Sequence, residues 1–170
     1  MDTTGGATPR ILVAGIGNRL IADDGFGPRV IDLLSQSDLS PIVDARDFGT
    51  AGMTIATDLA DFDAVIFIDS MDHEGEPGSL YKSRLVVDED PGDVTELARL
   101  TLHEAGLEGL LRFSRAIGTL PQDIYLVGCK PKTLEPSLEL STEVEAALEK
   151  ALTIVEEILE KILEKKWNGD

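Results

Sequence analysis

Short apolar runs alternate with segments of helical periodicity along most of the chain. Residues 11–14 and 64–68 carry only uncharged aliphatic and aromatic side chains, which indicates strands buried on both faces of a sheet. Residues 42–48 alternate between polar and apolar side chains, as in a strand with one exposed face. Residues 79–87 and 124–128 predict two further strands.

Apolar residues at helical spacing separate these strands. The last helix is the longest, and the pair Thr142 and Glu145 predicts that a capping box opens it. Its apolar residues recur every three or four positions as far as Ile162, and Lys165 and Lys166 near its end suit the helix dipole. The other segments with helical spacing are residues 26–34, 54–59, 93–100 and 108–117.

This alternation predicts an α/β protein, a three-layer α/β/α sandwich around a mostly parallel, roughly five-stranded twisted sheet. A length of 170 residues suits one domain with a sizeable core. We expect residues 1–10, which are small and polar, to form a flexible N-terminal tail. Residues 11–166 then form a single domain, whose long C-terminal helix packs on the sheet rather than against another chain.

The charge balance restricts the partners. The chain has 32 acidic and 15 basic residues, a net charge of −17, which argues against nucleic acid and anionic membranes as partners. No apolar stretch is long enough to span a bilayer, and the N-terminus lacks the features of a signal peptide. A single cysteine excludes an internal disulfide and a cysteine-built zinc site. We expect a cytoplasmic protein.

The segment after the first strand holds the first candidate for chemistry. Gly15 and Gly17 break the strand, and Asp23 and Asp24 follow before the next helix. One interpretation is a tight connection in which Asp24 favours the helix start. The other is a pair of carboxylates exposed for chemistry or for a metal. Leu20 stands where a dinucleotide fingerprint needs its third glycine, and no P-loop follows.

Three polar residues follow strand ends or precede a helix: Asp24, Asp69 and His103. Asp69 ends the most apolar strand, where an isolated buried carboxylate would be costly, so it should meet a metal, a cation or hydrogen-bond donors. A helix cap or a salt bridge for the aspartates, and a solvated imidazole for His103, are the alternatives. Two oxygen ligands and one nitrogen ligand suit a divalent ion such as nickel or zinc and leave a position open for substrate.

Other catalytic residue types lack support. Leu107 replaces the second histidine of a metalloprotease HExxH motif, and no serine-hydrolase elbow is present. Cys129 ends an apolar strand without a nearby base, so we interpret it as a small core residue. His73 lies in a turn, where a solvated side chain is the simpler expectation. Pattern alone does not name the reaction.

Several motifs along the chain resemble the hydrogenase maturation proteases, which trim the C-terminal extension from the large subunit of nickel-iron hydrogenases. The resemblance covers roughly residues 11–159 and rests on motifs in the family's order and spacing. They are GIGN at residues 15–18, DDGFG at 23–27, GTAGM at 49–53, IDS at 68–70, HEAGL at 103–107, LVG at 126–128 and LEP at 134–136.

The resemblance implies that Asp24, Asp69 and His103 gather around a metal and that residues 49–53 help to check the substrate. It implies an endopeptidase acting on the large-subunit precursor after nickel insertion, with the nickel supplied by the substrate and no organic cofactor. Either the metal or a carboxylate could activate the water. A non-catalytic metal-sensing chaperone for the nickel-loaded subunit and a metal hydrolase with its own ion are the alternatives.

Overall fold

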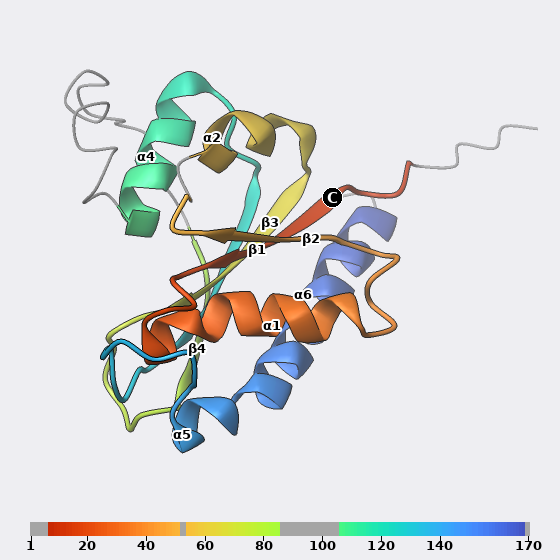
Figure 1. Ribbon diagram of the computed structural model, residues 1–170. Coiled ribbons are helices and arrows are strands. Elements are labelled where there is room, and N and C mark those ends of the chain that lie inside the picture. The colour runs from red at the N-terminus through yellow and green to blue at the C-terminus, as the bar shows by residue number, and fades with distance from the viewer. Residues whose placement is uncertain (1–6, 52–53, 86–105, 169–170) are drawn as a thin grey trace, which may run out of the picture.

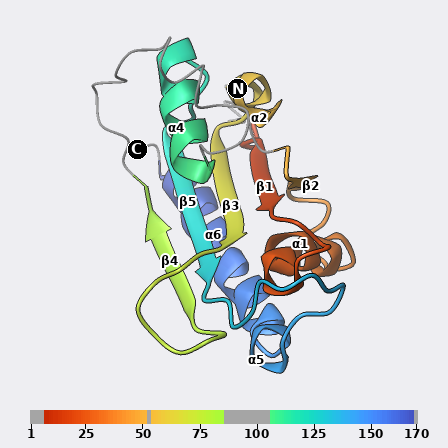
Figure 2. The ribbon, with the colours of Figure 1, turned by 60° about the vertical axis from the view of Figure 1, so that its left-hand side comes forward.

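The structure is a computed structural model that describes residues 7–51, 54–85 and 106–168. A five-stranded sheet in the order β2-β1-β3-β5-β4 forms its centre. All neighbouring strands pair in parallel except β4, which runs antiparallel to β5 at one edge (Figure 2). This arrangement confirms the predicted mostly parallel α/β sheet. The strands are β1 (Ile11–Ile16), β2 (Asp44–Gly49), β3 (Ala64–Ser70), β4 (Leu80–Arg84) and β5 (Asp123–Cys129).

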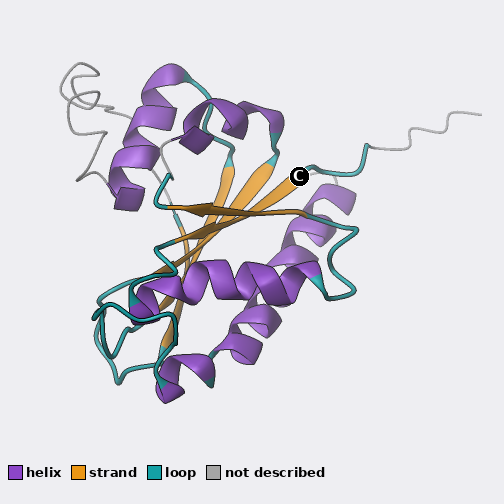
Figure 3. Cartoon of the chain, viewed as in Figure 1, coloured by secondary structure: helices purple, strands orange, loops and turns teal. Residues whose placement is uncertain are grey.

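Helices cover both faces of the sheet (Figures 1 and 3). One face carries α1 (Phe26–Ser35) and α6 (Leu148–Trp167), which packs on the sheet as predicted. The other face carries α2 (Ile55–Asp58) and α4 (Gly106–Ile117). Two short 3₁₀ turns, η1 (Ala22–Gly25) and η3 (Leu59–Asp61), and the short helix α5 (Thr142–Glu145) complete the elements.

The central strands are apolar throughout because each of their faces lies against helices. In β1, Ile11 and Val13 join the core under α1 and α6, whereas Leu12 and Ala14 join the core under α2 and α4. The side chains of β3 alternate between the same two cores. An uninterrupted apolar run is therefore what a doubly covered parallel strand requires.

Several element boundaries differ by a few residues from the sequence predictions, and two strands show the largest differences. The strand predicted from residue 42 begins at Asp44, because the Ile42 backbone N–H donates to the Leu39 carbonyl and closes a turn instead (N···O 2.9 Å). The strand predicted over residues 79–87 is β4, which spans Leu80–Arg84. Residues 86 and 87 of that prediction lie outside the described part of the chain, as does the predicted helical segment at 93–100. Most of the predicted tail, residues 1–6, also lies there.

The predicted capping box of Thr142 and Glu145 is wrong. The N-cap is Ser141, whose backbone is extended (φ −60°, ψ 156°) and whose Oγ accepts from the Val144 N–H. The Glu145 carboxylate instead pairs with Arg29 on α1 (3.3 Å). The helix is also interrupted by a turn, so that α5 ends at Glu145 and α6 begins at Leu148.

Since β1 and β3 are parallel neighbours, the segments that follow them leave the sheet at the same edge. That edge is where an open α/β sheet forms its sites. Within the described ranges, none of the helices has the length and apolar character needed to cross a membrane.

Candidate active site

Glycines let the start of α1 pack directly against the ends of β1 and β3. A Cβ on Gly27 would collide with the backbone carbonyls of Ile16 and Ile68, so only glycine permits this approach. Gly17 has a positive φ of 140°, and a Cβ there would collide with the Asp24 carbonyl. The sequence GIGN…DDGFG therefore brings η1, with its two aspartates, beside the end of β3.

Asp24 is held in place by donors from two segments. One carboxylate oxygen accepts from the Asn18 backbone N–H (2.8 Å), and the other accepts from the Ser70 hydroxyl (2.9 Å). The N-cap of α1 is Gly25, and no side chain caps that helix. The interpretation in which Asp24 caps the helix is therefore not what the structure shows. Its carboxylate spans the gap between the β1 loop and the end of β3.

Asp69, at the end of β3, lies half-buried close to Asp24. Burial, and after it the negative charge of Asp24, raises the pKa of Asp69 from 3.8 to about 7, while a hydrogen bond from the Ser70 backbone opposes the rise. No salt bridge involves Asp69 within the described ranges. Near neutral pH this carboxyl can either hold a proton or bind a cation.

Ser70 joins the two carboxylates, although the sequence analysis assigned no separate role to it. Its hydroxyl donates to Asp24, and its backbone N–H bonds to Asp69. One residue thus fixes the relative placement of both acids. The signals for this in the sequence are its position directly after Asp69 and its place in the IDS motif at residues 68–70.

The neighbouring Asp23 has a different environment from Asp24. Its carboxylate is fully buried and accepts from the backbone N–H groups of Lys132, Thr133 and Ser141 and from the Ser141 hydroxyl, at 2.7 to 3.0 Å. Burial alone would raise the pKa of Asp23, but these hydrogen bonds outweigh it and lower the pKa. Asp23 therefore ties the segment before α5 to the β1 loop.

His103, the third predicted ligand, lies outside the described residues, as do Gly52 and Met53 of the second glycine loop. Across residues 7–51, 54–85 and 106–168, no group of three or more histidine, cysteine, aspartate or glutamate side chains could hold a metal. The structure thus brings Asp24 and Asp69 together, and the place of His103 stays a prediction. Gly49 lies at the same edge, since its carbonyl accepts from the Gly17 N–H (3.0 Å).

Cys129 and His73, which the sequence analysis also considered, have structural rather than catalytic roles. Cys129 is fully buried, and burial, then the charge of Asp23, raises the pKa of its thiol to about 12, so the thiolate nucleophile is suppressed. His73 has one ring nitrogen 2.7 Å from the Glu74 carbonyl and the other 3.2 Å from the Ser79 carbonyl. Its imidazole holds the loop before β4 together.

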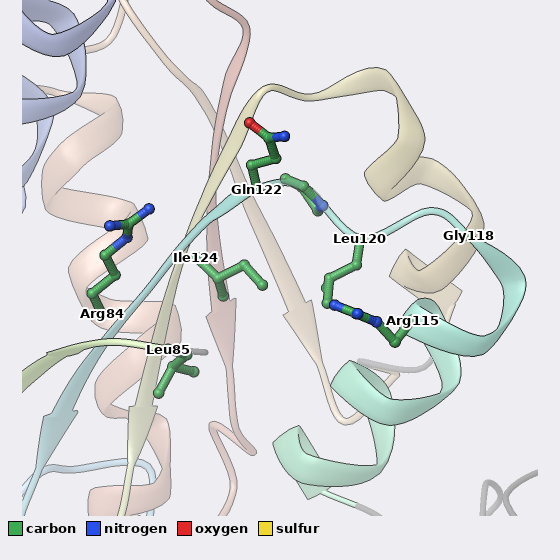
Figure 4. A pocket seen from close by; sticks show the side chains of 8 residues that line it. Arg84, Leu85, Arg115, Gly118, Leu120, Gln122 and Ile124 are labelled. Atoms are coloured by element: carbon green, nitrogen blue, oxygen red, sulfur yellow. The ribbon is translucent and has the colours of Figure 1, made fainter. Parts of the chain in front are cut away.

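A cavity of about 490 Å³ lies at the opposite end of the sheet, where β4 ends and β5 begins (Figure 4). Arg84 and Arg115 flank an apolar floor that includes Leu85 and Ile124. Among the described residues, no carboxylate lines this cavity, and neither Asp24 nor Asp69 reaches it. This cavity is therefore separate from the candidate site.

The paired carboxylates can bind a divalent cation or transfer a proton. A half-buried acid beside another acid is destabilised when both are ionised, and a cation between them would relieve this cost. An acid with a pKa near 7 can also take a proton from water and return it to a leaving group near neutral pH.

Comparisons with known proteins identify relatives along most of the chain. The family model described as hydrogenase maturation protease matches residues 28–158. The hydrogenase expression/formation protein HupD of Rhizobium leguminosarum bv. viciae is 35% identical over 128 residues, which are 75% of this chain and 62% of that protein. The hydrogenase 2 maturation protease of Escherichia coli (strain K12) is 36% identical over 131 residues, 76% of this chain and 77% of that protein. The chain thus spans about three fifths of the first of these curated relatives.

Solved structures show the same fold. The hydrogenase 2 maturation peptidase from Thaumarchaeota archaeon SCGC_AB-539-E09 is 60% identical with a TM-score of 0.70, and the match covers 89% of this chain and 98% of that one. The hydrogenase maturating endopeptidase HybD from E. coli is 34% identical with a TM-score of 0.71, covering 89% and 93% of the two chains.

Proposed function

Because the chain belongs to the hydrogenase maturation protease family, we propose that it is an endopeptidase that removes the C-terminal extension of a nickel-iron hydrogenase large-subunit precursor. In this proposal cleavage follows nickel insertion, and the nickel belongs to the substrate. The protein needs no organic cofactor and works in the cytoplasm. Its partner is the precursor, not nucleic acid or a membrane.

The observation that supports this proposal most is the pair formed by Asp24, in the segment after β1, and Asp69, at the end of the neighbouring parallel strand β3. Ser70 links the two acids, and burial beside Asp24 raises the pKa of Asp69 to about 7. Among the described residues, Asp24 accepts one hydrogen bond on each oxygen and Asp69 accepts one from the Ser70 backbone, so the pair retains acceptor capacity for a cation that arrives with the substrate. In the proposal His103 adds the nitrogen ligand.

Asp69 also suits the hydrolytic step, which would make the enzyme aspartyl-type. A water molecule attacks the carbonyl carbon of the scissile peptide bond, and Asp69 accepts the proton that the water loses. The proton then passes to the leaving amine as the C–N bond breaks. A carboxylate within reach of the attacking water can take this proton as a general base. Asp24, fixed by Asn18 and Ser70, stays in place to orient the cation.

The decisive experiment is the mass of a purified precursor before and after incubation with the protein, with and without nickel loaded in the precursor. We expect the nickel-loaded precursor alone to lose a C-terminal peptide. Binding without a change in mass would instead indicate a non-catalytic metal-sensing chaperone. A stoichiometric ion in the isolated protein, with cleavage of both precursors, would indicate a metal hydrolase with its own ion.

Three variants test the site residues in the same assay. Asp24→Asn, Asp69→Asn and His103→Ala should each fold and fail to process the nickel-loaded precursor, because a neutral or missing ligand holds a divalent cation poorly. Double variants should lose little more than the single ones, since residues that act as a unit cannot be removed twice. Asp38→Asn, at an exposed aspartate, is the matched control and should cleave normally. Near-normal processing by folded Asp69→Asn would rule out the shared site.

A further inference from the structure

The three most exposed large apolar side chains of the described residues belong to the two loops beside the candidate site. Leu138, Leu20 and Leu134 are 73%, 64% and 56% exposed. Leu20 lies in the loop that carries Asp24, and the other two lie between β5 and α5. Single exposed leucines are ordinary, but a cluster at one edge of a molecule indicates an interaction surface. We call these three side chains the leucine rim.

The two loops of the leucine rim run side by side. The Ala22 N–H donates to the Ser137 carbonyl (2.9 Å), and the Ser137 N–H donates to the Leu20 carbonyl (3.0 Å), which closes a parallel bridge. Leu20 and Leu138 each adjoin a residue of this bridge. The Asp23 N–H also donates to the Thr133 carbonyl, next to Leu134 (3.2 Å). All three leucines therefore lie on one continuous backbone platform.

This platform is built to keep its shape. The buried Asp23 carboxylate accepts four hydrogen bonds from Lys132, Thr133 and Ser141, at the two ends of the second loop. A loop whose backbone is fixed in this way loses little backbone freedom when a partner covers it. A surface that exposes leucines while holding its backbone rigid is suited to binding.

A hollow of about 220 Å³ opens beside Leu138. Its walls are Ala22, Gly25, Leu140 and the side chains of Arg19 and Arg29. Since a water molecule occupies about 30 Å³ in the liquid, the hollow has room for a side chain of a partner. The leucines and the arginine stems would contact an apolar side chain. The guanidinium groups themselves are already paired, Arg19 with Asp32 and Asp47 and Arg29 with Glu145.

We propose that the leucine rim is a docking surface for the folded large-subunit precursor, through an apolar patch beside its C-terminal extension. The inference rests on the proposed function. Ala22 and Gly25, which line the hollow, flank Asp23 and Asp24 in η1, so the rim continues directly from the site. If the precursor is cut at Asp24 and Asp69, it must lie over this edge of the sheet. A partner that binds elsewhere on the sheet would leave the leucine rim uncovered.

The test replaces Leu20, Leu134 and Leu138 with serine, singly and together. Steady-state cleavage of the nickel-loaded precursor gives KM and kcat, and immobilised precursor gives the equilibrium affinity. We expect the triple variant to raise KM about tenfold or more with kcat within about twofold, and to weaken binding by the same factor, because only uniform binding is lost. Ile42→Ser and Ile117→Ser are matched controls, since these side chains are 42% and 39% exposed at the opposite end of the sheet.

A triple variant with KM and affinity within about twofold of the wild type overturns the docking surface, even when the wild type cleaves normally. Equal losses in the two control variants overturn it too. If the wild-type protein is a dimer that the triple variant separates, the rim is an interface between copies of this chain. A wild type that binds the precursor without cutting it refutes the proposed activity, while the binding series still decides the docking surface. Absence of both binding and cleavage refutes both.

Discussion

Replacing Asp23 with asparagine should destabilise the protein strongly although no atom is added to the core. One carboxylate oxygen accepts three hydrogen bonds, and the other accepts one from the Ser141 backbone (2.7 Å). The best placement of the asparagine carbonyl keeps the three bonds as neutral ones. Its amide nitrogen then faces the Ser141 N–H, so two donors meet. Each of the three bonds loses about 1 kcal/mol when it changes from charge-assisted to neutral, and a buried unsatisfied donor costs about 1–3 kcal/mol, so we expect a loss of about 4–6 kcal/mol.

Urea unfolding and thermal melting measure this effect. For a chain of this size the loss corresponds to a fall in Tm of about 10–20 °C. Hydrogen exchange should locate it, with faster exchange at the amides of Lys132, Thr133 and Ser141. Asp38→Asn, at an exposed aspartate, should remain within about 0.5 kcal/mol of the wild type.

The pH dependence gives an independent test of the Asp23 carboxylate. Since folding lowers the pKa of Asp23, its ionisation stabilises the folded protein above the ordinary carboxyl range, and this stability is lost as the pH falls through the lowered pKa. The deficit of Asp23→Asn should therefore shrink in acid. A variant within about 1 kcal/mol of the wild type at pH 7 would show that the carboxylate does not hold the loop.

Three further predictions concern the core and the site. Cys129→Ala should keep its cleavage rate, and thiol reagents should label Cys129 only in denaturant, because the thiol is buried with a pKa of about 12. Loss of precursor processing in a folded Cys129→Ala variant would instead indicate that the thiol is the nucleophile. Gly27→Ala should cost about 2 kcal/mol or more in urea unfolding because its Cβ meets two backbone carbonyls, whereas at Gly25 the nearest atom to an added Cβ is 3.5 Å away and alanine should be tolerated. Asp69 should make stability fall between about pH 4 and pH 7, because its pKa of about 7 lets the folded protein hold a proton that the unfolded chain has released. Asp69→Asn should abolish that slope and be relatively more stable at pH 8, and an unchanged slope would contradict the raised pKa.

The sheet could be predicted because its central strands leave a clear pattern. β1 and β3 are buried on both faces, so every position selects an apolar residue, and the runs stand out from the amphipathic helices around them. The boundaries could not be predicted as well, since they depend on single hydrogen bonds. The start of α5 shows this: Thr142 and Glu145 match a capping box, yet Ser141 becomes the cap because Asp23 also binds it.

The approach of Asp24 to Asp69 follows from the topology, since parallel neighbours β1 and β3 release both residues at one edge. The roles of Asp23 and Ser70 do not follow from residue type. The partners of Asp23 are mainly backbone N–H groups more than 100 residues away, and such donors leave no mark in the sequence. Ser70 acts through a hydroxyl that could equally have faced solvent. The sequence thus predicts which acids meet, but not what fixes them.

Asp23 and Asp69 show that the number of donors, more than burial, separates a structural carboxylate from a functional one at this edge. Asp23 is fully buried, yet four hydrogen bonds stabilise its charge and lower its pKa. Asp69 is less buried, but with the charge of Asp24 beside it and, among the described residues, only a backbone hydrogen bond from Ser70 in its favour, its pKa rises to about 7. An under-satisfied acid gains most from a proton or a cation, so the reactive group is the one that the fold leaves short of donors. Asp23 also shapes the surroundings of Asp69. The loop that Asp23 fixes carries Leu134 and Leu138 of the leucine rim, and this rim lies next to the site where Asp69 would act.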